Sequence, residues 1–303
     1  MNFHAKVRKS NGLTRSCMKR CYIGYLNVRT LRQSRTIKKG KLHSRDEDKI
    51  DYYKDMMREN GLYVLAMSEV RRNDSGEEDV GDDFIFVWQG RCDDGSRGGV
   101  AFLLSPEAAK AWRKGGAVSN SSDSGRILAL NFKLGGNEGS WGIISVYGPT
   151  SQCSTDQKDR FWNELQETYD FFSKDQIVHV IGDFNARVGS RRQQDCSDIQ
   201  EAIGPHGLGK RNENGERLIN FCIANKLRVE HTFHKHKTSQ KATWFHPRFG
   251  TPGVIDMALV QREHAKHAAD IRVLPSVDTR SDHNLCRMKL IQCPDGVSHP
   301  VDR

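Results

Sequence analysis

Short apolar runs separated by polar turn residues recur along most of this chain, and they predict many β-strands with a few helices between them. The run Ile177–Ile181 stops at Gly182, and the run Leu62–Met67 is typical of a buried strand. Similar runs predict strands at 21–28, 84–88, 99–104, 127–132, 141–147, 241–245, 254–260 and 285–291.

Three segments instead place apolar residues at the spacing of an amphipathic helix. The first covers 46–60 and ends at Gly61, a typical helix stop, and the others cover 156–172 and 216–225. Strands mixed with a few helices favour an α/β sandwich. Loops are predicted for the polar stretches 29–45 and 189–215.

The chain has no internal repeat and no break in composition after residue 20, so we expect one domain over residues 21–292. Residues 1–20 are polar and basic without apolar periodicity, and we expect a disordered arm there. Residues 293–303 form a short tail.

Charge is unevenly distributed along the chain. The formal net charge is +9, and residues 1–45 hold 13 Lys and Arg with no Asp or Glu. A basic arm on a near-neutral body suits a polyanion such as nucleic acid. A solubilising or targeting tail would explain the same charge equally well.

Composition also limits the compartment. No apolar run approaches the roughly 20 residues of a membrane helix, and the first 20 residues lack a signal-peptide core. The eight cysteines show neither C-x-x-C nor the spacing of a zinc site, so free thiols are expected. We therefore expect a nuclear or cytoplasmic protein that is not secreted and has no membrane partner.

Polar residues with useful chemistry follow several of the apolar runs. Loops gather at strand ends and sites are built there, although one such residue alone is usually a turn former or a cap. The joint pattern is more specific than any member. The residues are Asn27, Glu69, Tyr147, Asp183, Asn185, Asp282 and His283.

Each of these residue types suits phosphoryl chemistry. Glu69 is a hard oxygen ligand of the kind that Mg²⁺ prefers. Asp183 could accept a proton from an attacking water, and a protonated His283 could stabilise negative charge on phosphorus. Asp256 lies within the apolar run Val254–Met257, where pairing with a histidine would explain it; an exposed strand position is the alternative.

In this order, the residues resemble the endonuclease/exonuclease/phosphatase superfamily, whose marks are an early Asn, a metal-binding Glu, Gly-Asp-x-Asn and a terminal Ser-Asp-His. Further segments resemble the endonuclease domains of LINE-type retrotransposons and the craniofacial development protein 2-like group. They are Asn27–Leu31, Ser145–Thr150, Gly182–Gly189, Arg211–Leu218, Thr243–Trp244 and Ser281–Leu285.

The resemblance implies a four-layer α/β fold of the deoxyribonuclease and AP-endonuclease type, in which two mixed β-sheets pack together between helices. It also implies hydrolysis of phosphodiesters in DNA with Mg²⁺, or Mn²⁺, as cofactor. Carried over by motif, the metal residues are Asn27, Glu69 and Asp282. The catalytic residues are Tyr147, Asp183, Asn185, Asp256 and His283.

Some positions depart from the family pattern. Leu26 stands where this group commonly has Trp, and the residues around Asp256 lack the usual Asn and Tyr. Arg29 stands where other superfamily nucleases often have an acidic residue, which favours a phosphate contact there. Backbone phosphates of DNA are expected to meet Arg29, Lys38, Lys39 and Arg187.

The pattern favours a metal-dependent DNA endonuclease of retrotransposon origin. One alternative is a catalytically weak or inactive binding module on the same fold, and a less favoured one is a phosphatase or lipid phosphodiesterase. A complete retroelement protein would continue into a reverse transcriptase. We therefore expect either a truncated element copy or a stand-alone relative.

Overall fold

A computed structural model of the protein describes residues 21–31, 36–38, 41–43, 45–90, 98–117, 119–133, 140–173 and 176–291. The side chains of 36–48 are outside this description. The expected basic arm, 1–20, and the expected tail, 293–303, also lie outside the described residues.

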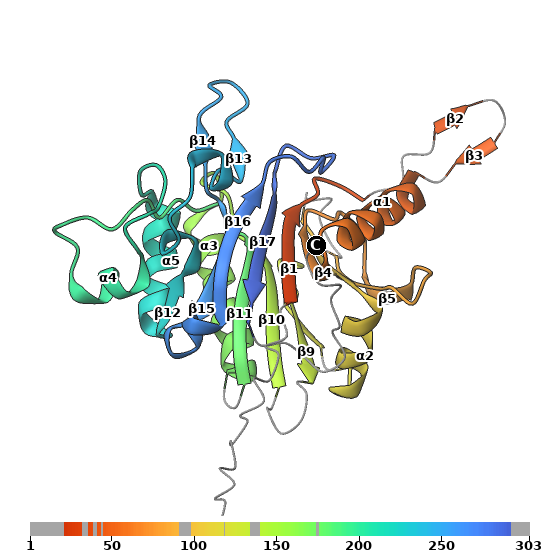
Figure 1. The fold of residues 1–303 in the computed structure, drawn as a ribbon, viewed down its shortest axis with the longest axis horizontal. Coiled ribbons are helices and arrows are strands. Elements are labelled where there is room, and N and C mark those ends of the chain that lie inside the picture. The colour runs from red at the N-terminus through yellow and green to blue at the C-terminus, as the bar shows by residue number, and fades with distance from the viewer. Residues whose placement is uncertain are drawn as a thin grey trace, which may run out of the picture.

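Two β-sheets packed face to face form the centre of the molecule (Figure 1). The seven-stranded sheet has the order β16-β17-β1-β4-β7-β6-β5, and the six-stranded sheet has the order β12-β15-β11-β10-β9-β8. The strands of the first sheet are β1 (Cys21–Asn27), β4 (Leu62–Ser68), β5 (Ser75–Asp79), β6 (Ile85–Gln89), β7 (Val100–Leu104), β16 (Ala268–Leu274) and β17 (Leu285–Leu290). Those of the second are β8 (Ser119–Ser121), β9 (Ile127–Lys133), β10 (Ser140–Tyr147), β11 (Gln176–Asp183), β12 (Leu227–Val229) and β15 (Asp256–Gln261).

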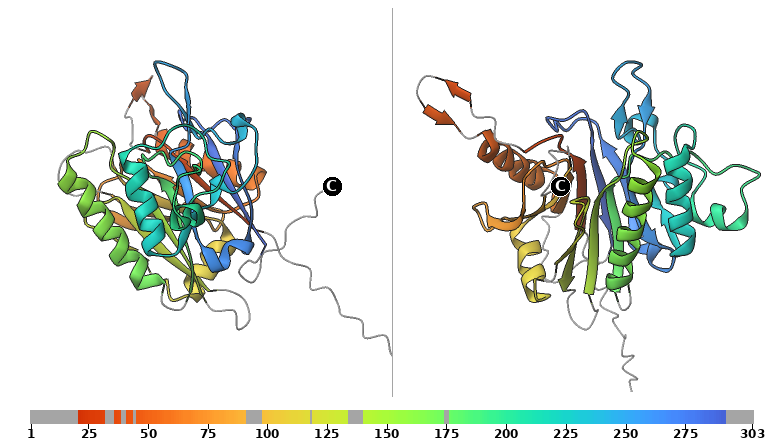
Figure 2. Two further views of the ribbon diagram at one scale, coloured as in Figure 1. Left: turned by 90° about the vertical axis from the view of Figure 1, so that its left-hand side faces the viewer. Right: turned by 180° about the vertical axis from the view of Figure 1, so that it is seen from behind.

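Helices cover the outer faces of both sheets (Figure 2). Helix α1 (Arg45–Glu59) packs on the seven-stranded sheet, while α3 (Thr155–Phe172) and α5 (Glu213–Ala224) pack on the six-stranded sheet. Helix α2 (Pro106–Lys114) buries Trp112 in the core between the sheets, and the short α4 (Ser197–Ala202) packs against α5. The molecule is therefore the four-layer α/β sandwich that the sequence predicted.

Alternation along β1 shows how one strand serves two cores. Ile23 and Tyr25 face the second sheet and belong to the core between the sheets. Leu26 faces outward and joins the core under α1, which includes Tyr53 and Met57 of the helix. Both faces of the strand are buried because successive side chains point to opposite faces of a sheet, which explains why the sequence of β1 is apolar almost throughout.

Strand register brings the site residues to one end of the sandwich. Strand β1 runs parallel to β4 with Asn27 opposite Ser68, the residue before Glu69. Strand β10 runs parallel to β11 with Tyr147 opposite Asp183, and β15 is antiparallel to β11 with Asp256 opposite Asp183. Pairing within each sheet thus aligns residues that are far apart in the sequence.

The structure corrects several expected elements. Helix α2 was missed because its core face is mainly alanine, although the Ser105 cap followed by Pro106 is a helix-start signal. Helix α4 lies within the expected loop 189–215, and a hairpin of β2 (Thr36–Lys38) and β3 (Lys41–His43) lies within the expected loop 29–45. Strands β5 and β8 were also missed, because these edge strands have little apolar alternation, and β16 was missed although Ile271 and Val273 alternate with polar residues.

The expected strand 241–245 is only two residues long. The 3₁₀ helix η2 (Thr238–Gln240) precedes it, and β13 (Trp244–Phe245) pairs with β14 (Pro252–Gly253). This hairpin, the β13–β14 hairpin, projects at the top of Figure 1.

No helix in the described part of the chain has the length and apolar character needed to cross a membrane. The five cysteines in that part are free thiols, as expected.

Candidate active site

Asn27 joins the two sheets at the end of the sandwich where the strand ends meet. Its amide nitrogen Nδ2 donates to Oε1 of Glu69 at 3.0 Å and to Oδ2 of Asp183 at 2.9 Å. The backbone N–H of Arg29 holds the amide oxygen at 2.9 Å and fixes the orientation of the side chain. Three residues separated by up to 156 positions are thereby in direct contact.

Glu69 is held from several sides. Its Oε1 also accepts the hydroxyl of Tyr147 at 3.1 Å, and its Oε2 accepts a guanidinium N–H of Arg71 at 2.7 Å. Burial, followed by the charge of Glu69, raises the pKa of Tyr147, so the phenol stays a neutral donor. In this structure the hydroxyl of Tyr147, which was predicted to be catalytic, therefore orients Glu69.

An Asp–His pair lies beside this cluster. His283 Nδ1 lies 2.8 Å from Oδ2 of Asp256, and both side chains are buried. The ligand atoms of Asp183, Asp256 and His283 all lie within 4.8 Å of one another. Ser281 holds the loop in place, because its hydroxyl donates to the carbonyl of Asn27 at 2.6 Å. Asp256 is therefore not an exposed strand residue but the partner of the histidine.

Burial and charge set the protonation of this group. Burial of the Asp183 carboxylate, together with the charge of Asp256, raises its pKa from 3.8 to about 7. Burial alone would lower the pKa of the His283 imidazole, but the charge of Asp256 and its hydrogen bond raise it from 6.5 to about 9. Near neutral pH the imidazole is consequently a cation and Asp183 is poised between its two protonation states.

A tight turn presents Asp183 and Asn185. Gly182 has a φ of 138°, and a Cβ there would lie 2.3 Å from the carbonyl oxygen of Val146, so only glycine fits. The backbone N–H of Asn185 donates to Oδ1 of Asp183 at 2.8 Å, and its side-chain amide donates to the carbonyl of Gly148 at 3.0 Å. Asn185 thus orients the carboxylate directly.

The start of α5 clamps this turn from outside. Asn214 donates from Nδ2 to the carbonyls of Pro149 at 2.9 Å and Asn185 at 3.0 Å, and its side chain is buried. Asn212 caps the helix and also accepts the N–H of Arg187 at 2.9 Å. The segment Arg211–Leu218, singled out only by resemblance, therefore has a physical role in positioning the Gly-Asp-Phe-Asn turn.

The structure places Asp282 against Arg29. Its carboxylate is 3.5 Å from Nε of Arg29, and both side chains are more than a third exposed. It is not part of the Asp183–Asp256–His283 group, which is the candidate metal-holding group found among the described residues. Its role as a metal ligand stays a prediction.

Of the basic residues predicted to contact DNA, the structure describes the side chains of Arg29 and Arg187. Arg29 is 60% exposed in its side chain and lies on the rim of the site. The guanidinium of Arg187 lies 6.0 Å from the ring centre of Trp244 at the base of the β13–β14 hairpin. Lys39 lies outside the described residues, and so does the side chain of Lys38.

Sequence reasoning missed two arginines at the site. Arg71 contacts Glu69, as described above, and Arg126 donates to the carbonyl of Tyr147 at 3.0 Å while its guanidinium lies 5.1 Å from the centre of that ring. Arg71 stands two residues after Glu69, and that spacing was the one available signal. Arg126 immediately precedes β9, which pairs with the strand β10 that ends at Tyr147. Nothing in the sequence around Arg126 indicated this contact.

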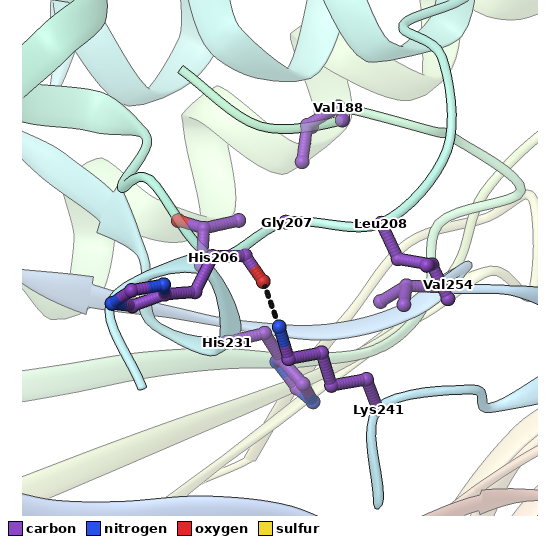
Figure 3. A pocket seen from close by; sticks show the side chains of 9 residues that line it. Val188, His206, Gly207, Leu208, His231, Lys241 and Val254 are labelled. Atoms are coloured by element: carbon purple, nitrogen blue, oxygen red, sulfur yellow. Dashed lines mark hydrogen bonds between the residues drawn. The ribbon is translucent and has the colours of Figure 1, made fainter. Parts of the chain in front are cut away.

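A small cavity lies under the loops beside the site (Figure 3). Its volume is about 10 Å³, which is room for no more than one water. Lys241 crosses it and donates to the carbonyl of His206 at 2.6 Å, with His231 on another wall. Two larger hollows in the described part of the chain are lined by residues of α1, α2, β4, β5, β6 and β9 and of the loops between them. None of these three hollows is lined by Glu69, Asp183 or His283.

Comparison with known families and proteins agrees with this geometry. The model of the Endonuclease/Exonuclease/phosphatase family matches residues 26–283. Craniofacial development protein 2 of Bos taurus is 27% identical over 273 residues, which are 89% of this chain and 41% of that protein. The protein of the same name from Tragulus javanicus is also 27% identical over 273 residues, with 42% of its length covered. The chain thus spans less than half the length of these relatives.

Solved structures share the fold at low sequence identity. The AP endonuclease LMAP from Leishmania major superposes with a TM-score of 0.65 at 13% identity, covering 95% of this chain and 92% of that one. The Xenopus laevis APE2 catalytic domain gives 0.64 at 13% identity, covering 92% and 94%. The endonuclease domain of TRAS1, a telomere-specific non-LTR retrotransposon, gives 0.54 at 9% identity, covering 90% and 98%. The family model covers most of the chain and the fold agrees with it, so this chain belongs to the Endonuclease/Exonuclease/phosphatase family.

Proposed function

We propose that this protein is a divalent-cation-dependent phosphodiesterase that cleaves DNA internally. The observation that carries the proposal is the convergence of Glu69, Asp183 and His283 from both sheets, joined by Asn27. Carboxylates beside a buried cationic imidazole suit a reaction that needs a base and stabilisation of charge on phosphorus.

The donor set fits a hard divalent cation. Carboxylate oxygens are the ligands that Mg²⁺ and Mn²⁺ prefer, and Glu69 supplies them, with Asn27 holding that carboxylate in place through Nδ2. The Oδ1 of Asp256 is buried with no hydrogen-bond partner among the described residues, which is a cost that a nearby cation would relieve. When bound, the cation supplies Lewis-acid polarisation of a phosphate oxygen.

The residues of this chain divide the remaining work. Asp183, held by Asn27 and by the N–H of Asn185, accepts the proton of the attacking water. His283 engages Asp256 through Nδ1, so Nε2 is the nitrogen that donates a hydrogen bond to a phosphoryl oxygen. Asp256 keeps this imidazole protonated and oriented.

An open, partly basic surface around the cluster supports a polymeric substrate. Arg29 and Arg187 lie on its rim. The β13–β14 hairpin exposes Phe245 by 46% and Phe249 by 68%, next to Arg248. Exposed aromatic rings beside cations suit nucleic acid, which offers phosphates and stackable bases. One neighbour is described as an AP endonuclease and another as bound to a product DNA hairpin, and both support DNA as the substrate. Action in the nucleus is part of the proposal.

A plasmid assay tests the proposal. Purified protein is incubated with supercoiled DNA and Mg²⁺, with EDTA and Asp183→Asn as controls, and nicked circles are quantified. The proposal predicts nicking that both controls abolish. DNA binding without nicking would instead indicate a binding module. Intact circles, together with release of terminal phosphate from a linear duplex assayed alongside, would indicate a phosphatase, as one structural neighbour, the 3′ phosphatase NExo from Neisseria, is described.

A further inference from the structure

Arg71 makes a contact that the proposed reaction does not use. Its guanidinium donates to Oε2 of Glu69 at 2.7 Å, with side chains 23% and 15% exposed. The other oxygen, Oε1, accepts the neutral donors of Asn27 and Tyr147. Arg71 is therefore the cationic partner of the carboxylate that the proposed function assigns to the metal.

The backbone is built to hold this pair together. Glu69 and Arg71 both have left-handed φ values, 55° and 54°, on either side of the fully buried Val70. Two backbone hydrogen bonds hold the segment in place, from Val70 N–H to Gly99 at 3.2 Å and from Arg71 N–H to Gly98 at 3.0 Å. Each left-handed residue costs about 1–2 kcal/mol, so surrounding contacts must enforce the shape. The Glu69–Arg71 pair is consequently a fixed feature of the fold.

A guanidinium and a divalent cation compete for the same carboxylate. A neutral amide or hydroxyl can share a carboxylate oxygen with a metal ion, because neither repels it. A guanidinium 2.7 Å from Oε2 carries a positive charge into the space that the cation needs, and the repulsion is strong at a partly buried site. Binding of the cation at Oε2 of Glu69 would therefore displace Arg71.

We propose that Arg71 is a charged latch on Glu69. Without a cation it neutralises the carboxylate; when the cation binds, the guanidinium is displaced and contacts a phosphate oxygen of the DNA backbone. Cation binding and DNA binding are then coupled through one side chain, since each favours the released position. This inference rests on the proposed function, because it takes Glu69 as a ligand of the cation.

Arg72 supplies a matched control. It has the same charge and is the next residue in the chain, but it pairs with Glu78 at 3.0 Å and stacks on Trp88 with 4.7 Å between the guanidinium carbon and the ring centre. It makes no described contact with Glu69. Arg71→Met and Arg72→Met therefore remove equal charge, and the unbranched Met suits the left-handed backbone at position 71 no worse than Arg.

Mn²⁺ binding to the DNA-free protein, measured by electron paramagnetic resonance, separates the outcomes. We expect Arg71→Met to bind Mn²⁺ about fivefold to tenfold more tightly than wild type, with Arg72→Met changed by less than about twofold. Arg71→Lys, which keeps charge with a shorter reach, should fall between. Weaker or unchanged binding in Arg71→Met, with thermal unfolding showing a folded protein, would overturn the latch. A wild type that binds no Mn²⁺, or binds it equally after Glu69→Gln, would overturn the proposed function itself.

The coupling is tested on duplex DNA in the non-cleaving Asp183→Asn background. We expect Arg71→Met to weaken DNA binding about threefold to tenfold when Mn²⁺ is present and to leave it unchanged in EDTA. An equal loss in both conditions would show that Arg71 contacts DNA without any latch.

Discussion

Asp183 should destabilise the cation-free protein when it is ionised. Its pKa is raised from 3.8 to about 7 because the carboxylate is buried beside Asp256. Between pH 3.8 and about pH 7, the Asp183 carboxyl therefore binds more protons in the folded state than in the unfolded chain. The stability contributed by this group is therefore fully present below pH 4 and is lost as the pH rises through 7.

The magnitude follows from the same two values. The difference between 3.8 and about 7 corresponds to about 4 kcal/mol well above pH 7. Replacing Asp183 with Asn removes the cost of burying the charge. The new NH₂ group cannot accept a hydrogen bond, so it loses the one from Asn27 Nδ2 or the one from the N–H of Asn185. Losing one such bond costs about 1–3 kcal/mol. We therefore expect Asp183→Asn to raise the free energy of unfolding by about 2 kcal/mol at pH 8.5.

Urea unfolding in EDTA at pH 5.5 and pH 8.5 measures this. EDTA is needed because a bound cation would hold the carboxylate ionised. The wild type should lose more stability than Asp183→Asn between these two pH values, and the variant should be the more stable protein at the higher pH. An Asp183→Asn protein that is less stable than wild type at pH 8.5 would refute the reasoning about burial.

Three further predictions concern neighbouring groups. The rate of cleavage should fall as the pH rises through about 9, because His283 loses its proton, and Asp256→Asn should move this fall to lower pH in a pH–rate profile. Asn214→Ala removes two hydrogen bonds to the loops beside Asp183, so urea unfolding should show a loss of about 1–3 kcal/mol and the cleavage rate should fall about tenfold. Phe249→Ala, at an exposed position, should change stability by less than about 0.5 kcal/mol yet weaken DNA affinity about fivefold or more in a binding titration.

Much of the fold was predictable because buried strands are apolar along their whole length. Ile177–Ile181 and Leu62–Met67 both fell in strands at the centre of a sheet. Edge elements escaped, because β5 has the sequence Ser-Gly-Glu-Glu-Asp and is almost wholly exposed. Its pairing depends on β6 rather than on its own composition.

The candidate site was predictable in its residues but not in its contacts. Motif order placed Glu69 and Asp183 in one site, and register now shows how the strands bring them together. Only the two-residue spacing pointed to the contact between Arg71 and Glu69, and no pattern indicated that Asn214 would hold the turn at Asn185. Such contacts depend on left-handed backbone and on loops that meet only in three dimensions.

The central claim is that Glu69 and Asp183 act in one catalytic unit. The most direct measurement is the Mg²⁺-dependent rate of DNA cleavage by Glu69→Gln, Asp183→Asn and the double variant, compared with wild type. Residues of one unit are strongly non-additive, so each single change should lower the rate about a thousandfold and the double variant should be little worse. Losses that multiply, or a single variant that retains wild-type cleavage, would contradict a shared site.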